Sequence, residues 1–162
     1  MKVNLIRASD EEKSVVQNLY PLYLHDLSEF IDDIDVNEKG CFNIKFLDLF
    51  WQNDSLFAFL IRVDDKLAGF TLLSTPPYTS MEVDYLVNEF FILKKYRRRG
   101  VGRLAAFELL NKFQGRWEIY ESPTNKLAQV FWRKVIREYT LGQYESLDDG
   151  TKQRFNNAVV MR

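Results

Sequence analysis

The order of apolar and polar positions divides the chain into alternating strands and helices. Strict alternation over Val3–Arg7 predicts a short first strand. Apolar positions at helical spacing follow, and they predict a helix that begins at Ser9 and runs to about Ser28. Glu12, three residues after Ser9, would complete a capping box at its start. A second, short helix is expected over 44–51.

The middle of the chain has the composition of an antiparallel meander. Segments 55–63, 67–74 and 81–93 are rich in Phe, Leu, Ile and Val, and a tight turn and a proline-containing loop separate them. Such short connections favour antiparallel pairing. The third segment is long enough to carry a bulge, and one bulge reverses the face that every later side chain takes. The orientation of side chains on this strand therefore stays open.

Helical periodicity returns after residue 100. Val101, Ala105, Leu109 and Phe113 recur every four residues and predict a buried stripe, with Gly115 as the C-cap of that helix. A short strand is expected over 117–121.

The pair Ser122-Pro123 predicts the start of a last helix. The expected buried stripe of this helix consists of Leu127, Phe131, Trp132, Val135 and Ile136. Segments 141–146 and 154–160 predict a closing hairpin. Because the sequence has neither a linker nor an internal repeat, residues 1–162 are expected to form a single domain.

Composition narrows the class of protein. The chain has 162 residues and 46% hydrophobic content, which suits one globular domain with a core. Its net charge of −1 argues against a nucleic-acid partner. Cys41 and His25 are the single cysteine and histidine, so a disulfide within the chain and a Cys/His zinc site are not expected. The longest apolar run, 56–61, is too short to span a membrane, and the N-terminus resembles no secretory signal, so we expect a cytoplasmic protein with no membrane partner.

Positive charge is concentrated between an apolar strand and a helix. Six basic residues fall within ten positions: Lys94, Lys95, Arg97, Arg98, Arg99 and Arg103. Gly100 and Gly102 lie at the start of the helix that follows. Free N–H groups and the positive end of the helix dipole, together with Arg side chains, form a site for a pyrophosphate.

Two patterns identify a family. The first, Arg97-x-x-Gly100-x-Gly102, resembles the acetyl-CoA motif of the GNAT superfamily of N-acetyltransferases. A later pattern resembles the start of the last helix in that family, Asn125-x-x-Ala128-x-x-Phe131-Trp132. The order of the expected elements agrees with the family over nearly the whole chain.

The resemblance implies a fold and a site. The fold would be α/β, of the α+β kind, with a mixed and mostly antiparallel sheet flanked by helices and splayed at the coenzyme-binding strand. Acetyl-CoA would be the cosubstrate with no metal, an amine would be the acceptor, and the family allows a homodimer. By position, the coenzyme would contact Phe91, Ile92, Leu93, Arg97, Arg98, Arg99, Gly100, Val101, Gly102, Arg103, Asn125 and Trp132.

The implied reaction is direct attack of the amine on the thioester. An alkyl ammonium has a pKa of about 10.4, so a base must remove a proton at neutral pH. Glu89 is the candidate because it directly precedes the residues expected to hold the thioester, although it could instead face outward or pair with an Arg. The family often has a Tyr acid where this chain has Trp132. Tyr139 is the candidate replacement, with Tyr144 or water as alternatives.

Other interpretations stay open. Gly100-x-Gly102-x-x-Ala105 also fits a dinucleotide fingerprint, with Glu121 as the ribose-binding acid. The antiparallel meander and the short remaining chain argue against it. A domain that keeps the fold but only senses acyl-CoA, or binds a protein partner, is the non-enzyme alternative.

The acceptor side is less well determined by the sequence. The acidic segment 26–38 is either a solvated loop or a wall that attracts a cationic amine, of the polyamine or aminoglycoside type. A peptide N-terminus or a lysine side chain is the other acceptor class. Phe30 and Tyr78 are candidates to line that side.

Overall fold

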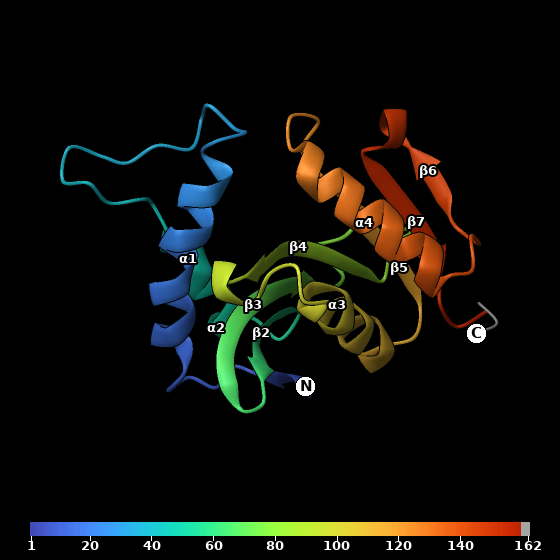
Figure 1. Ribbon diagram of the computed structural model, residues 1–162, viewed down its shortest axis with the longest axis horizontal. Coiled ribbons are helices and arrows are strands. Elements are labelled where there is room, and N and C mark those ends of the chain that lie inside the picture. Colours follow the sequence, from blue (N-terminus) through green and yellow to red (C-terminus); the bar gives the residue numbers. More distant parts are fainter. Residues whose placement is uncertain (160–162) are drawn as a thin grey trace.

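The computed structural model describes residues 1–159. Within them, seven strands form one mixed sheet in the order β1-β2-β3-β4-β5-β7-β6 (Figure 1). The strands are β1 Val3–Arg7, β2 Leu56–Val63, β3 Lys66–Ser74, β4 Tyr85–Ile92, β5 Arg116–Tyr120, β6 Glu145–Leu147 and β7 Lys152–Asn156. Only β4 and β5 pair in parallel among these neighbours. The predicted α/β class with a mostly antiparallel sheet is confirmed.

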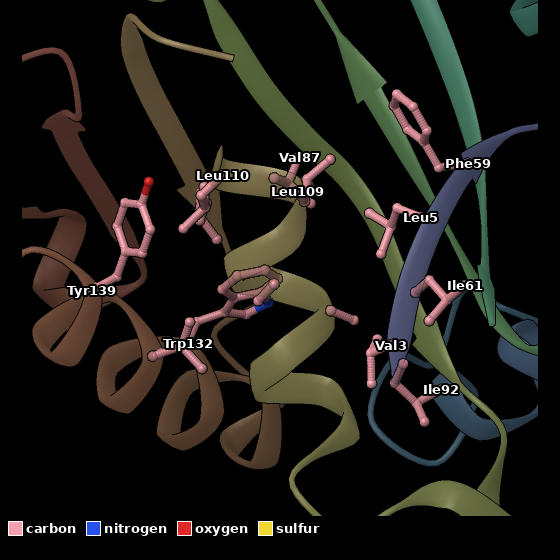
Figure 2. Packing of buried hydrophobic residues seen from close by; sticks show 14 of the residues in the cluster. Val3, Leu5, Phe59, Ile61, Val87, Ile92, Leu109, Leu110, Trp132 and Tyr139 are labelled. Carbon is pink, nitrogen blue, oxygen red and sulfur yellow. The ribbon is translucent and has the colours of Figure 1, made fainter. Parts of the chain in front are cut away.

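Helices cover both faces of this sheet. They are α1 Lys13–Leu27, α2 Leu49–Gln52, α3 Val101–Lys112 and α4 Lys126–Tyr139. On one face, α1 and α2 bury side chains such as Val16 and Phe50 against Leu60 and Phe70 of the sheet. On the other face lie α3 and α4, and Figure 2 shows Trp132 projecting from α4 toward α3. The predicted α3 stripe is confirmed at Val101, Ala105 and Leu109, which are all buried, but not at Phe113, which follows the end of the helix and is only partly buried.

The sheet opens between β4 and β5. The two strands pair only where Tyr85–Val87 faces Trp117–Ile119. β4 continues to Ile92, and beyond Val87 the described residues form no further pair between the two strands. This is the splay that the family resemblance implied.

A bulge at Asn88 decides which way β4 presents its side chains. Leu72 of β3 faces Glu89, whereas the next residue, Leu73, faces Val87, so Asn88 is the extra residue. The Ser74 hydroxyl donates to Asn88 Oδ1 at 2.6 Å. As a result Val87 packs with α3 and α4, while Glu89 points toward α1. The orientation that the sequence left open is thus decided by tertiary pairing.

Several predicted boundaries at helix starts are wrong. The capping box between Ser9 and Glu12 forms, with both hydrogen bonds at 3.3 Å, but α1 begins only at Lys13. The last helix begins at Lys126 rather than at Pro123, because the Asn125 side chain accepts a hydrogen bond from the Ala128 N–H and caps it.

Other expectations also need correction. Leu127 does not belong to the buried stripe, since it is 70% exposed. Gly115 is no helix cap, because α3 ends at Lys112. A Cβ at Gly115 would lie 2.9 Å from Asp84 Oδ2, so a close approach explains this glycine. The closing hairpin of β6 and β7 forms, and Val160 at the end of the predicted segment lies outside the described residues.

Candidate active site

A cleft of about 580 Å³ opens at the splay. The C-terminal end of α1, the second half of β4, the basic loop and α4 surround it. Its lining includes Tyr23, Asp26, Leu27, Phe30, Phe90, Phe91, Ile92, Arg97, Arg98, Gly100, Gly102, Arg103, Asn125, Phe131 and Trp132. Most of the residues that sequence reasoning assigned to the coenzyme therefore lie around one space. Leu93, Arg99 and Val101 lie outside its lining.

The basic loop leaves room and free donors for an anion. Arg98 and Gly100 both adopt left-handed backbone conformations, with φ of 59° and 79°. Left-handed residues of this kind curl successive N–H groups into an anion-binding concavity. Gly100 is the N-cap of α3, and no side chain of the described residues caps that end. A Cβ at Gly100 would meet nothing within 4 Å, so the space over the loop is open.

Gly102 has a different reason to be a glycine. A Cβ there would lie 3.1 Å from Cε2 of Phe131 on α4. Phe131 also stacks on Phe90, with ring centroids 5.8 Å apart. Gly102 therefore permits close packing between α3 and α4 at the floor of the cleft.

Arg97 braces the loop instead of pointing freely into the cleft. Its Nε donates to the Ile92 carbonyl at 2.7 Å, and its Nη2 pairs with Asp26 Oδ2 of α1 at 2.5 Å. Partial burial would raise the pKa of Asp26, but Arg97 and Lys94 outweigh that effect and hold this pKa below its usual range. The coenzyme loop is thereby tied to the end of α1.

The other arginines that line the cleft differ in how free they are to bind an anion. Arg103 forms a bidentate ion pair with Glu138 of α4, which also lines the cleft. Arg98 lines the cleft and is exposed, and no ion pair holds it within residues 1–159. Arg98 is thus the arginine best placed to meet an anionic ligand.

Glu89 lies on β4 against α1. The Tyr20 hydroxyl donates to Glu89 Oε1 at 3.0 Å, and the Tyr23 hydroxyl interacts with the same carboxyl. Burial raises the pKa of Glu89, and the bonds from Tyr23 and Tyr20 offset only part of that effect. Glu89 lies outside the cleft lining, directly behind its neighbours Phe90 and Tyr23, which do line the cleft. A carboxylate with a raised pKa at such a position has the properties of a general base.

The acid candidates lie elsewhere. Tyr139 is 2% exposed, and its hydroxyl donates to Asn111 Oδ1 at 2.9 Å on the α3 side of the core. Tyr144 packs against the same core and does not line the cleft. Trp132 does line the cleft, where its ring meets Phe90 edge-on at 5.0 Å.

Sequence reasoning missed the contribution of α1. Tyr20, Tyr23 and Asp26 all reach the site, and their spacing of three residues was the available signal. Phe30 lines the cleft as expected. Tyr78 does not, because its hydroxyl accepts a hydrogen bond from Asn53.

Glu121, the acid of the dinucleotide alternative, is 3% exposed and lies outside the cleft. Among residues 1–159, no helix has the length and apolar character to cross a membrane. Within residues 1–159, no three or more His, Cys, Asp or Glu side chains lie together in a position to hold a metal ion.

Comparisons with known proteins agree with this geometry. The family model described as Acetyltransferase (GNAT) family matches residues 18–135. An acetyltransferase from Thermus thermophilus superposes with a TM-score of 0.69 at 15% identity, over 96% of this chain and 97% of its own. The aminoglycoside acetyltransferase AAC(6')-Ib, in complex with coenzyme A, superposes with a TM-score of 0.66 at 9% identity, over 97% and 96%.

GCN5 from Tetrahymena has a TM-score of 0.60 at 11% identity, with 96% of each chain covered. The chain shows no sequence match among curated proteins. The family model spans the strand, basic loop and helix that build the cleft, and it covers well over half of the sequence. This protein belongs to the acetyltransferase (GNAT) family.

Proposed function

We propose that this protein transfers the acetyl group of acetyl-CoA to a primary amine by direct attack on the thioester. The observation that carries the proposal is the position of Glu89, a half-buried carboxylate with a raised pKa, beside a cleft that begins at a basic, glycine-containing helix N-terminus. Glu89 is not itself among the lining residues, but its neighbours Phe90 and Tyr23 are, so the base would lie directly behind the wall of the space that holds the coenzyme.

The proposed coenzyme contacts follow from the chemistry of the cleft. Arg98 and the free N–H groups at the start of α3 would bind the pyrophosphate. The unpaired half of β4, with Phe90, Phe91 and Ile92, would run beside the pantetheine arm. Asn125 and Trp132 would bound it from α4.

We propose a cationic small molecule as the acceptor. Residues 28–44 leave the end of α1 at the cleft as a long loop (Figure 1), and Glu29, Asp32, Asp33 and Asp35 on this loop are exposed. None of these four acids lines the cleft, so they would act from a distance, because negative charge near a site raises the local concentration of a cation and its association rate. A protein of similar fold is an aminoglycoside acetyltransferase, and aminoglycosides carry several amines.

The first experiment is a thermal melt with acetyl-CoA, with NAD as the control ligand. A ligand at 100 times its Kd adds about 2.7 kcal/mol, or roughly 5–10 °C in Tm for a domain of this size. A shift with acetyl-CoA alone supports the coenzyme site. A shift with NAD alone would contradict it.

Thiol release is then measured with a polyamine, an aminoglycoside and a lysine-containing peptide. Coenzyme binding without release for any amine would favour the sensor alternative. The acceptor class is tested by the triple variant Asp32→Asn, Asp33→Asn, Asp35→Asn, which should raise KM for the amine several-fold at low salt.

The matched control is Glu11→Gln, Glu145→Gln, Asp149→Asn, which changes net charge equally at exposed positions outside the cleft. It should leave that KM unchanged. Equal KM values for the two triple variants would overturn the role of the acidic loop.

A further inference from the structure

The proposed reaction needs a proton donor for the departing thiolate, and the residues discussed so far do not supply one. When the amine displaces coenzyme A, the departing sulfur carries the electron pair of the broken C–S bond and must be protonated. The indole N–H of Trp132 is no useful acid, and Tyr139 and Tyr144 lie outside the cleft. This inference rests on the proposed function and concerns the group that supplies that proton.

Among residues 1–159, Tyr23 of α1 is the tyrosine that lines the cleft. Its hydroxyl interacts with the Glu89 carboxyl and with the backbone N–H of Phe90, at the point where β4 has left β5. Its ring is held edge-on to Phe70, with centroids 5.8 Å apart, and tilted against Phe91 at 5.6 Å. The phenol is thus fixed between the candidate base and the unpaired half of β4.

We propose that Tyr23 is the catalytic acid that protonates the departing thiolate, with Glu89 as its proton source. The amine enters in its neutral form, having given its ammonium proton to solvent. Its nitrogen forms a bond to the acetyl carbon, and Glu89 takes the one further proton that the nitrogen loses as the amide forms. The C–S bond breaks with its electron pair on sulfur, which takes the phenolic proton of Tyr23. The phenolate then recovers a proton from Glu89, so the amine proton ends on the thiol and both side chains return to their starting states.

The electrostatics of the pair support this order of events. Burial raises the pKa of Tyr23 well above its usual value, and the negative charge and hydrogen bond of Glu89 raise it further. The phenol therefore stays protonated while Glu89 waits as a base. Once Glu89 has taken the amine proton, its charge is gone and the phenol becomes a stronger acid, at the moment when the thiolate forms.

Tyr20 offers a matched control. Its hydroxyl also binds Glu89, but it is 2% exposed and lies outside the cleft lining. Tyr23→Phe and Tyr20→Phe each remove one hydroxyl from the same carboxyl and keep an aromatic ring in the packing. Only the first removes the hydroxyl of a residue that lines the cleft.

The experiment compares acetyl transfer by the two variants, with whichever of the three amine classes wild type acetylates fastest. Tyr23→Phe should lower kcat by about 10²-fold or more, with the Kd for acetyl-CoA within about twofold of wild type. Tyr20→Phe should lower kcat much less and move the acidic limb of the pH–rate profile upward, because it removes a bond that favours ionised Glu89.

A fluorinated tyrosine at position 23 gives a direct readout of the acid. Below about pH 10, the pH–rate profile of wild type should show no fall in rate from ionisation of Tyr23, because the raised pKa keeps its phenol protonated throughout that range. A polyfluorinated ring has a more acidic phenol and should bring an alkaline limb into the measurable range. Appearance of that limb supports the proposal.

Equal kcat values for Tyr23→Phe and Tyr20→Phe, in an active wild type, would overturn the role of Tyr23 alone. So would a fluorinated protein with an unchanged pH profile. If wild type binds acetyl-CoA but none of the three amines causes it to release thiol, the proposed function is overturned, and the role of Tyr23 with it.

Discussion

The Tyr20 hydroxyl donates a 3.0 Å hydrogen bond to Glu89, which joins two residues 69 positions apart in the chain. The bond links the buried face of α1 to the strand that borders the cleft. Tyr23, one turn further along α1, interacts with the same carboxyl. The ionisation of Glu89 therefore depends on how α1 packs on β4, and each change in that packing should appear in the pH dependence of the protein.

Glu89→Gln should abolish most of the transfer and stabilise the fold. We expect kcat to fall by about 10²- to 10⁴-fold, since Gln cannot accept the proton. Because burial raises the pKa of folded Glu89, the folded state holds its proton more tightly than the unfolded state, and stability falls as pH rises through the folded pKa. In urea unfolding, the unfolding free energy of the variant minus that of wild type should therefore be larger at pH 8 than at pH 4. Full activity in the variant would remove Glu89 from the mechanism.

Gly69→Ala should disrupt the coenzyme strand. A Cβ at Gly69 would overlap the Phe91 carbonyl oxygen, which is backbone of β4 and cannot rotate away. We expect a loss of about 2–4 kcal/mol in unfolding free energy, together with weaker acetyl-CoA binding.

The matched control for this change is Gly40→Ala. Gly40 has a φ of +74°, and a Cβ at this position would meet nothing within 4 Å, so only its left-handed backbone opposes the change. About 1 kcal/mol should be lost, with coenzyme binding intact. Similar losses in the two variants would mean that β4 yields to the extra methyl group.

Glu138→Gln should strengthen coenzyme binding. The Glu138 carboxylate holds Arg103 in a bidentate pair at the rim of the cleft and would compete with the phosphates of the coenzyme. Removing its charge should lower KM for acetyl-CoA a few-fold at low salt, with the effect fading as salt screens the charges. A double-mutant cycle measures the coupling between the two residues. When Arg103→Gln is already present, Glu138→Gln should change KM little further, because only the long-range repulsion between Glu138 and the phosphates is then removed.

Glu121→Gln should stabilise the protein at alkaline pH. Burial raises the pKa of Glu121 to about 8, with Arg133 and Gln153 offsetting part of the effect. Both carboxyl oxygens lack a well-aligned hydrogen-bond partner among the described residues. The folded state thus keeps this proton to a higher pH than the unfolded state does. The free energy of unfolding therefore decreases as pH rises from about 4.5 through about 8.

The variant should match wild type near pH 4 and exceed it by about 1–3 kcal/mol at pH 9 in urea unfolding. Identical stability curves at both pH values would show that Glu121 is solvated in the folded state. Coenzyme binding should not change, because Glu121 lies outside the cleft.

Local patterns in the sequence were enough to predict features that depend only on residues close together in the chain, such as the buried face of a helix and the turn at its start. The stripe of Val101, Ala105 and Leu109 marks the buried face of α3 because helix geometry brings these positions together. Gly100 at its N-cap marks an open turn for the same local reason. The family and the fold could therefore be inferred from the chain alone.

Boundaries at helix starts were less predictable, because several polar residues compete for the same capping role. Ser122, Pro123 and Asn125 all suit a helix start, and the side chain that reaches the Ala128 N–H decided between them. The sequence does not rank such neighbours.

Tertiary structure alone decided the chemistry of the site. Asn88 bulges because of its pairing with β3, and that extra residue turns Glu89 toward α1. Asp26 and Glu138, distant in sequence, then engage Arg97 and Arg103, so the arginines of one basic run have different roles. Strand register and long-range ion pairs depend on which segments meet in space, and periodicity along the chain carries no record of that.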